Sequence, residues 1–183
     1  NVLNFLTKKG FSPSDIGVSG LVVGRENASR QSRTTAFYDR FRGRIMFPIK
    51  DSRGKVLGFS GRVLDAVREA KYINSPETPV FHKGDLLFGL DVARTAIRDK
   101  NEAVLVEGEF DVMSAHKAGV ENAVASKGTA LTGKQVTTLA RLCENVALCF
   151  DMDVAGDSAS RRGIELLDIA GVNIKVARLG GSV

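Results

Sequence analysis

The chain has 183 residues, 43% of them hydrophobic, so it is long enough to bury a core as one domain or as two small ones. No apolar run approaches the ~20 residues that a membrane-spanning helix requires. The start of the chain lacks the basic-then-apolar order of a signal peptide, so we expect a cytoplasmic protein. Two separated cysteines, Cys143 and Cys149, and two isolated histidines argue against a disulfide framework and a zinc site.

The net charge of +5 is unevenly distributed along the chain. Residues 1–100 carry 18 Lys and Arg against 10 Asp and Glu, whereas residues 101–183 carry 8 against 11. A basic part joined to a mildly acidic part predicts that the first binds a polyanion and that the second holds cations. A solvated surface is the alternative explanation of the same imbalance.

The first hundred residues predict a mixed α+β region. Ser12-Pro13 supplies a helix N-cap and a first-turn proline. The turn residues Asp51-Ser52-Arg53-Gly54 separate two β runs. The expected elements are a helix over 1–9, a second short helix after Ser12, a loop over 24–35, two strands within 44–64, an irregular stretch over 66–85 and a helix at about 90–99.

The remaining residues predict an α/β fold. Apolar runs alternate with segments of helical spacing, and Thr132 with Gln135 forms a T-x-x-Q capping box. This alternation indicates a buried parallel sheet with helices on both faces. The expected strands cover 102–106, 122–125, 144–150 and 173–178, and the expected helices cover 109–118, about 132–142 and about 155–170.

Acidic residues follow two of the predicted strands. Glu107 comes directly after strand 102–106, and Asp111 lies about one turn into the next helix. Asp151 and Asp153 come directly after the third apolar run, two residues apart and therefore on one face. Ligands of open parallel sheets bind at the carboxyl ends of the strands. If the first and third strands are neighbours, the four carboxylates converge on one edge of the sheet.

Three interpretations of these carboxylates are open. Clustered carboxylates repel each other and are tolerated mainly when cations occupy the site, and all-oxygen ligands select Mg²⁺ or Mn²⁺. Alternatively, each pair is solvated at a helix N-terminus, where the dipole favours acids. The third interpretation is the nucleophile of a haloacid-dehalogenase-type phosphatase. It is disfavoured because Val-Ala-Gly, rather than Gly-Thr, follows Asp153.

Two motifs carry a resemblance to a known family. Residues 107–111 (EGEFD) match E-G-x-x-D, and residues 151–156 (DMDVAG) match D-x-D-x-A-G. Together they resemble the Toprim signature that primases, topoisomerases and some nucleases share. Segments 38–64, 71–90 and 123–132 are similar to the RNA-polymerase core of bacterial DnaG-type DNA primases. Another Toprim enzyme, nuclease- or topoisomerase-like, and a non-catalytic nucleotide- or DNA-binding module are the alternatives.

The resemblance implies a Toprim-type parallel sheet flanked by helices over residues 89–183, preceded by a smaller basic α+β subdomain over residues 1–88. It also implies primer synthesis by Mg²⁺- or Mn²⁺-dependent nucleotidyl transfer from NTPs on single-stranded DNA. Asp111, Asp151 and Asp153 are then metal ligands, and Glu107 is either a ligand or the general base.

The basic residues are assigned to the nucleic acid and the nucleotide. We expect Arg40, Arg42 and Arg44 to alternate along one strand and to form a row that meets phosphates, unless they only solvate an edge strand. The loop residue Lys127 is expected at the same edge as the carboxylates. By resemblance, the nucleotide-contacting surface also includes Arg62, Lys71, Tyr72, Asn74 and Lys83.

We further expect a monomeric fragment of a longer bacterial protein that acts in the cytoplasm at the nucleoid. The family carries a zinc module upstream, a helicase-binding domain downstream and a further acidic pair in a D-P-D context, none of which this chain contains. Contact with the replicative helicase would therefore run through a region absent here. One metal position would also be incomplete.

Overall fold

The computed structural model describes residues 1–25, 37–64, 70–127, 131–150 and 158–177. The chain divides into two compact units, and each is described by itself. The N-terminal unit comprises residues 1–48 and 57–82, and the C-terminal unit comprises residues 49–56 and 83–183. Among the described residues, no helix is long and apolar enough to cross a membrane.

Short elements build the N-terminal unit. Helix α2 begins as the sequence predicts, with Ser12 Oγ accepting a hydrogen bond from Asp15 N at 3.1 Å and Pro13 in the first turn. Strands β1 and β2 pair antiparallel, and a second sheet has the order β3-β4-β5. The elements are α1 (Val2–Lys8), α2 (Pro13–Val18), β1 (Val22–Gly24), β2 (Phe37–Asp39), β3 (Arg44–Lys50), β4 (Val56–Val63) and β5 (Tyr72–Asn74).

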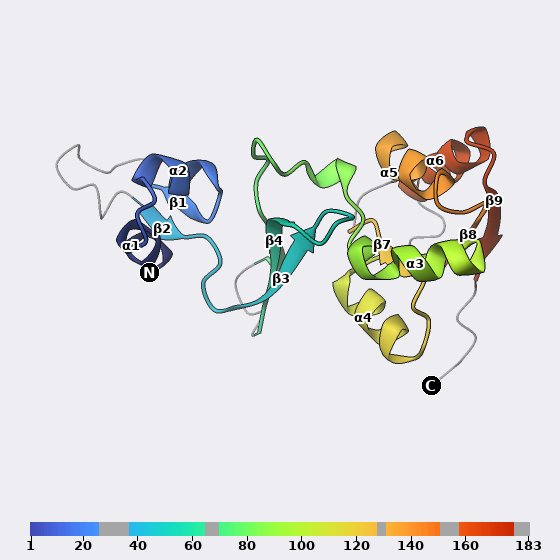
Figure 1. Cartoon of the computed structure of the whole chain (residues 1–183), viewed down its shortest axis with the longest axis horizontal. Coiled ribbons are helices and arrows are strands. Elements are labelled where there is room, and N and C mark those ends of the chain that lie inside the picture. The colour runs from blue at the N-terminus through green and yellow to red at the C-terminus, as the bar shows by residue number, and fades with distance from the viewer. Residues whose placement is uncertain (26–36, 65–69, 128–130, 151–157, 178–183) are drawn as a thin grey trace. The chain divides into compact units, whose positions relative to one another are not determined.

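The C-terminal unit is a four-stranded parallel sheet with the order β7-β6-β8-β9, flanked by helices (Figure 1). The first and third of the strands expected from the sequence are therefore neighbours, which is the condition for the carboxyl ends of both to meet at one edge. Its elements are η1 (Lys83–Asp85), α3 (Leu90–Lys100), β6 (Glu102–Val106), α4 (Glu109–Lys117), β7 (Ala123–Ala125), α5 (Gly133–Ala140), β8 (Asn145–Leu148), α6 (Ser158–Ile169) and β9 (Asn173–Val176).

Alternate residues of β6 pack into two different apolar clusters. Ala103 and Leu105 are fully buried in the larger cluster, which contains residues of α3, α5 and α6. Val104 and Val106 pack in the smaller cluster, where Val112 of α4 covers them. Because successive side chains of a strand leave from opposite faces, this division shows that helices cover both faces of the sheet.

Two expectations for the N-terminal unit are wrong. Arg40, Arg42 and Arg44 do not share a strand, because β2 ends at Asp39 and β3 begins at Arg44. The intervening residues form a turn in which Gly43 adopts φ +62°, a left-handed conformation that interrupts an extended chain. In addition, the stretch expected to be irregular contains β5, which pairs antiparallel with β4.

Candidate active site

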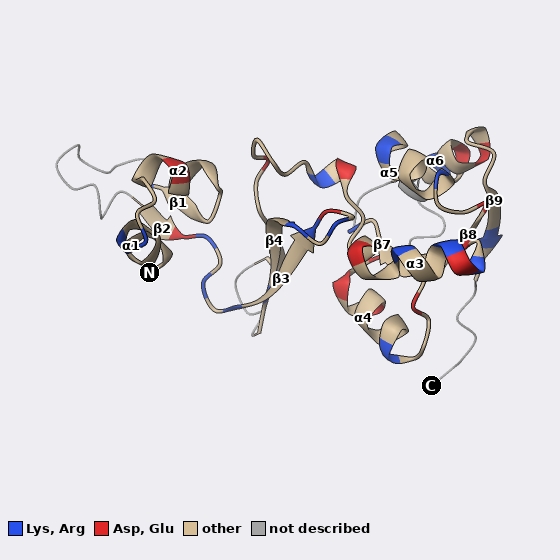
Figure 2. Ribbon diagram, viewed as in Figure 1, with Lys and Arg blue, Asp and Glu red and all other residues tan. Residues whose placement is uncertain are grey.

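The turn from β6 into α4 fixes two of the predicted carboxylates. Glu107 is half-buried and follows the last residue of β6. Gly108 is the N-cap of α4, and its N–H donates a hydrogen bond to Asp111 Oδ2 at 2.9 Å. Glycine has no side chain with which to cap the helix, so the carboxylate of Asp111 satisfies this amide. The capping bond holds Asp111 at the carboxyl edge of the sheet, where Figure 2 shows acidic residues at the start of α4.

The end of β8 lies beside the end of β6. Leu148 pairs with Leu105, and Cys149 N donates to Leu105 O at 2.8 Å. The described chain therefore runs along β6 as far as Cys149, two residues before the predicted D-x-D. Asp151 and Asp153 lie outside the described residues. Within the described ranges, no three His, Cys, Asp or Glu side chains are placed to hold a metal ion.

A buried ion pair lies next to these carboxylates. Lys127 Nζ is 2.9 Å from Glu109 Oε1, and the two side chains are only 6% and 5% exposed. Lys127 has φ +68°, and its backbone N–H donates to Glu107 O at 3.1 Å. Burial lowers the pKa of Lys127; Glu109 opposes this shift, whereas the nearby cation Lys83 adds to it. The pair joins the start of α4 to the loop after β7.

Sequence reasoning placed Lys127 at this edge but missed Glu109. The sequence contains only a partial signal for Glu109. It lies within EGEFD, directly after the helix-capping glycine, but at a position that the motif leaves variable. Its partner is 18 positions away in sequence. The two approach because β6 and β7 are parallel neighbours.

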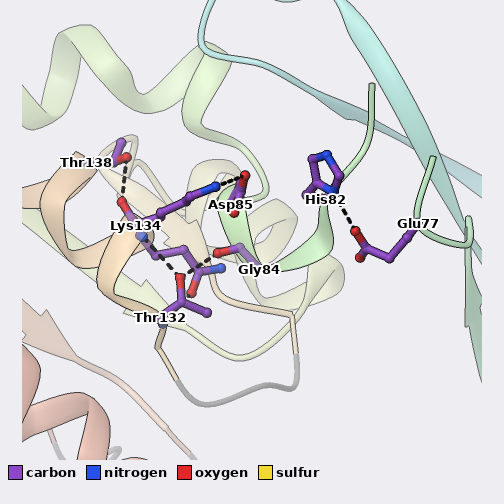
Figure 3. Close-up of polar contacts among 8 residues, drawn as sticks. Glu77, His82, Gly84, Asp85, Thr132, Lys134 and Thr138 are labelled. Atoms are coloured by element: carbon purple, nitrogen blue, oxygen red, sulfur yellow. Dashed lines mark hydrogen bonds and ion pairs between the residues drawn. The ribbon is translucent and has the colours of Figure 1, made fainter. Parts of the chain in front are cut away.

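The turn that carries Lys83 is attached to the start of α5 (Figure 3). The hydroxyl of Thr132 donates to Gly84 O, and Lys134 Nζ lies 2.6 Å from Asp85 Oδ2. Gln135 Nε2 donates to Leu86 O at 2.8 Å. The predicted capping box forms as well, so Thr132 and Gln135 both cap α5. Thr132 also holds η1, and Gln135 holds the residue that follows it. These contacts fix the backbone on which Lys83 is carried.

Three of the predicted nucleotide-contacting residues share one face of the β4–β5 pair. Arg62 lies directly opposite Tyr72 in the register, and Ser60 lies opposite Asn74. Directly opposite residues of antiparallel strands project to the same side. The Arg62 guanidinium stacks over the Tyr72 ring at 5.5 Å and donates to the Tyr72 hydroxyl at 3.3 Å. This arrangement leaves a half-buried guanidinium and a phenol side by side.

The other basic residues have more varied surroundings. Arg40 Nε donates to Gly20 O at 2.9 Å, and Arg42 lies over the Tyr38 ring at 5.2 Å. One terminal nitrogen of Arg44 donates to Gly61 O and, at 2.9 Å, to Ala70 O. Lys71 is exposed. Arg40 and Arg44 therefore brace neighbouring backbone, while Arg42 and Lys71 face solvent.

The site residues thus fall into two sets. The C-terminal unit brings together Glu107, Asp111, Lys127 and Glu109, with Lys83 close enough to influence the pKa of Lys127. The N-terminal unit brings together the second set, which consists of Arg62, Tyr72 and Asn74. Chemically, the first set offers carboxylates and cations at a sheet edge. The second offers a cation–π pair and an amide.

Comparison with known proteins identifies the family to which the chain is similar. The family described as "DNA primase catalytic core, N-terminal domain" matches residues 1–94, and the "Toprim-like" family matches residues 104–182. The DNA primase of Halalkalibacterium halodurans is 46% identical over 176 residues, which cover 96% of this chain and 28% of the relative. The DNA primase of Synechococcus elongatus is 47% identical over 184 residues, covering 97% and 26%.

Solved structures give the same result. A DnaG primase catalytic domain bound to single-stranded DNA superposes with a TM-score of 0.81 at 36% sequence identity, and the match covers 98% of this chain and 57% of that one. The chain spans about a quarter of the length of the two curated relatives. It belongs to the DnaG-type DNA primase family and matches the catalytic core of that family.

Proposed function

We propose that this chain forms part of the nucleotidyl-transfer site with which its parent protein synthesises RNA primers on single-stranded DNA. The observation that carries the proposal is the adjacency of β6 and β8, because each is followed by one half of the acidic motif. The membership in the primase family and the DNA-bound structural relative support it. The reaction joins a 3′-hydroxyl to the α-phosphate of an NTP and releases pyrophosphate.

The donor set fits a hard divalent cation. Glu107, Asp111, Asp151 and Asp153 offer only carboxylate oxygens, which Mg²⁺ and Mn²⁺ prefer. Asp111 uses Oδ2 to accept from the Gly108 amide, which leaves Oδ1 for another ligand. Bound divalent ions would lower the pKa of the attacking hydroxyl and neutralise charge on the leaving group. We assign the three aspartates as ligands and Glu107 as ligand or general base.

Basic residues of this chain would bind the substrates. Lys83 and Lys127 lie near the carboxylate edge, and Lys83 is suited to the phosphates of an incoming nucleotide because a fixed turn carries it. Lys127 is buried against Glu109 and instead positions the start of α4. In the N-terminal unit, Arg62, Tyr72 and Asn74 offer a charge, a ring face and an amide to a nucleotide or strand.

Because Arg40, Arg42 and Arg44 do not share a strand, they do not form a row that could bind phosphates together. We therefore assign nucleic-acid contacts first to Arg42 and Lys71, which are exposed, and only secondarily to Arg40 and Arg44, which brace the backbone. We retain the division into a basic subdomain over 1–88 and a Toprim domain over 89–183, a monomeric state and a bacterial cytoplasmic location. Contact of the parent protein with a replicative helicase is proposed through regions outside this chain.

Primer synthesis by the full-length protein tests the proposal. The assay supplies labelled NTPs, a single-stranded DNA template and Mg²⁺, and its variants are Asp151→Asn, Asp153→Asn and Glu107→Gln. We expect each to abolish dinucleotide formation while circular dichroism and thermal unfolding stay as in the wild type. Asp99→Asn, at an exposed acid near the end of α3, is the charge-matched control and should keep full activity. Near-normal synthesis by the Asp151 or Asp153 variant would disprove the metal-site assignment.

A further inference from the structure

A pocket lined by three arginines lies in the C-terminal unit, apart from the carboxylate edge. Its volume is about 310 Å³. Arg98 lies near the end of α3, four residues before β6 begins. Arg141 is the C-cap residue that follows α5, four residues before β8 begins. These arginines therefore lie toward the amino ends of the strands, whereas Glu107 follows the carboxyl end of β6. The lining residues are Ser52, Leu90, Arg94, Arg98, Thr138, Arg141 and Leu142.

The pocket concentrates the positive charge of three arginines. Arg94 and Arg98 are one helical turn apart and therefore on the same face of α3, and Arg141 joins them from α5. In the part of the chain that the structure describes, no Asp or Glu lines the pocket, and none of the three guanidinium groups has an ion pair or hydrogen bond to another residue. Three clustered cations repel each other, and a bound anion relieves that repulsion. Guanidinium groups also present paired N–H donors that match phosphate oxygens.

The walls of the pocket are held in place by contacts of their own. Ser52 lies in the turn between β3 and β4, where Asp51 Oδ1 accepts from Arg53 N and Lys55 N, both at 2.9 Å. These backbone bonds also lower the pKa of Asp51, which keeps it an acceptor over a wider pH range. Lys50 Nζ lies 3.1 Å from Asp91 Oδ2 and so links the turn to the start of α3.

We propose that this pocket binds a small ligand that carries two or more adjacent phosphates. Arginines from two helices converge on one concave volume, with the hydroxyls of Ser52 and Thr138 as further hydrogen-bond partners. A nucleic-acid backbone would instead favour cations spread along an open groove. The volume lies at the lower end of the range for ligand pockets, which suits an oligophosphate better than a large ligand. Pyrophosphate and the phosphate chain of a nucleoside triphosphate share this chemistry.

Calorimetric titration of the full-length protein tests the proposal. Pyrophosphate and ATP are titrated separately in the presence of a chelator, so that the carboxylate edge holds no divalent cation. The variants are Arg94→Gln and Arg141→Gln, and Lys117→Gln, at an exposed lysine of α4, is the charge-matched control. We expect each arginine variant to weaken binding about tenfold or more, as the loss of a charge-assisted hydrogen bond predicts. The control should bind as the wild type does.

Comparing the pyrophosphate titration with the ATP titration also identifies which part of the ligand the pocket contacts. If the arginine variants lose pyrophosphate and ATP binding equally, the pocket contacts only the phosphate chain. If they lose more affinity for ATP, the pocket also contacts the nucleoside. Either result supports the proposal. Arg94→Lys should retain part of the affinity, which separates charge from folding. The proposal is wrong if neither ligand binds, or if both arginine variants bind like the wild type. It is also wrong if the variants lose only the binding of a single-stranded oligonucleotide, titrated in parallel.

Discussion

The buried pair Lys127–Glu109 predicts strongly non-additive effects of substitution. At 2.9 Å and an effective dielectric constant of about 20, two unit charges attract by roughly 6 kcal/mol. The pKa of Lys127 is nevertheless lowered, which means that burial of the ammonium costs more than Glu109 returns. Removing one partner leaves the other charge buried alone. We therefore expect Lys127→Met and Glu109→Gln each to destabilise the C-terminal unit by about 3–5 kcal/mol.

The double variant Glu109→Gln/Lys127→Met should be about as stable as the wild type, because it removes both desolvation costs together with the attraction. Hydrogen exchange of the full-length protein, measured by mass spectrometry on peptides covering β6 and β7, reports the opening free energy of this region. Lys134→Met, at an exposed lysine of α5, is the control and should change exchange little. If the two single effects simply add in the double variant, the account of the pair is wrong.

Three further predictions use the same kinds of measurement. Because the pKa of Lys127 is lowered from 10.5, the unfolded chain binds more protons between the folded and unfolded pKa values. The stability of the wild type relative to the double variant should thus rise with pH through that window and stay constant below it, where the folded and unfolded chains both hold the proton. A difference in stability that does not change across the window would contradict this. Burial raises the pKa of Cys143, which is 4% exposed. Iodoacetamide should therefore alkylate Cys143 much more slowly than the half-buried Cys149, as measured by peptide mass spectrometry. Equal alkylation rates would show that Cys143 is not buried. Thr132→Ala should cost about 1–2 kcal/mol in urea unfolding, because the hydroxyl caps α5 and holds Gly84, whereas Thr137→Ala, on the exposed side of the same helix, should cost less than about 0.5 kcal/mol. Similar losses of stability in both variants would show that the Thr132 hydroxyl contributes no more than that of an exposed helix threonine.

Local sequence signals were sufficient for most of the C-terminal unit. The run EAVLV gave β6 with its observed bounds, and the T-x-x-Q pattern gave the start of α5. The sequence left the order of the strands open, because strand order depends on tertiary packing. The structure places β6 beside β8, so that their carboxyl ends meet at one edge of the sheet. Strands that are buried on both faces read as short continuous apolar runs, which stand out from the helical spacing of the segments between them.

The N-terminal unit was predicted less well, because single residues there decide the backbone path. Alternating arginines around Phe41 resemble a strand, but Gly43 takes a left-handed conformation and ends the alternation. Strand β5 is only three residues long, so its pairing with β4, rather than its own pattern, makes it a strand. The Glu109–Lys127 pair also depends on tertiary structure, since each side chain alone looks like a surface charge.

The central claim is that residues after β6 and β8 hold a divalent cation at one edge of the sheet. The most direct test is a crystal structure of the full-length protein soaked in Mn²⁺, with anomalous scattering used to locate the ion. We predict a peak within coordination distance of Glu107 and of Asp151 or Asp153, which disappears in the Asp151→Asn variant. A wild-type crystal without a Mn²⁺ peak at this edge, or a peak that persists unchanged in that variant, would contradict the assignment.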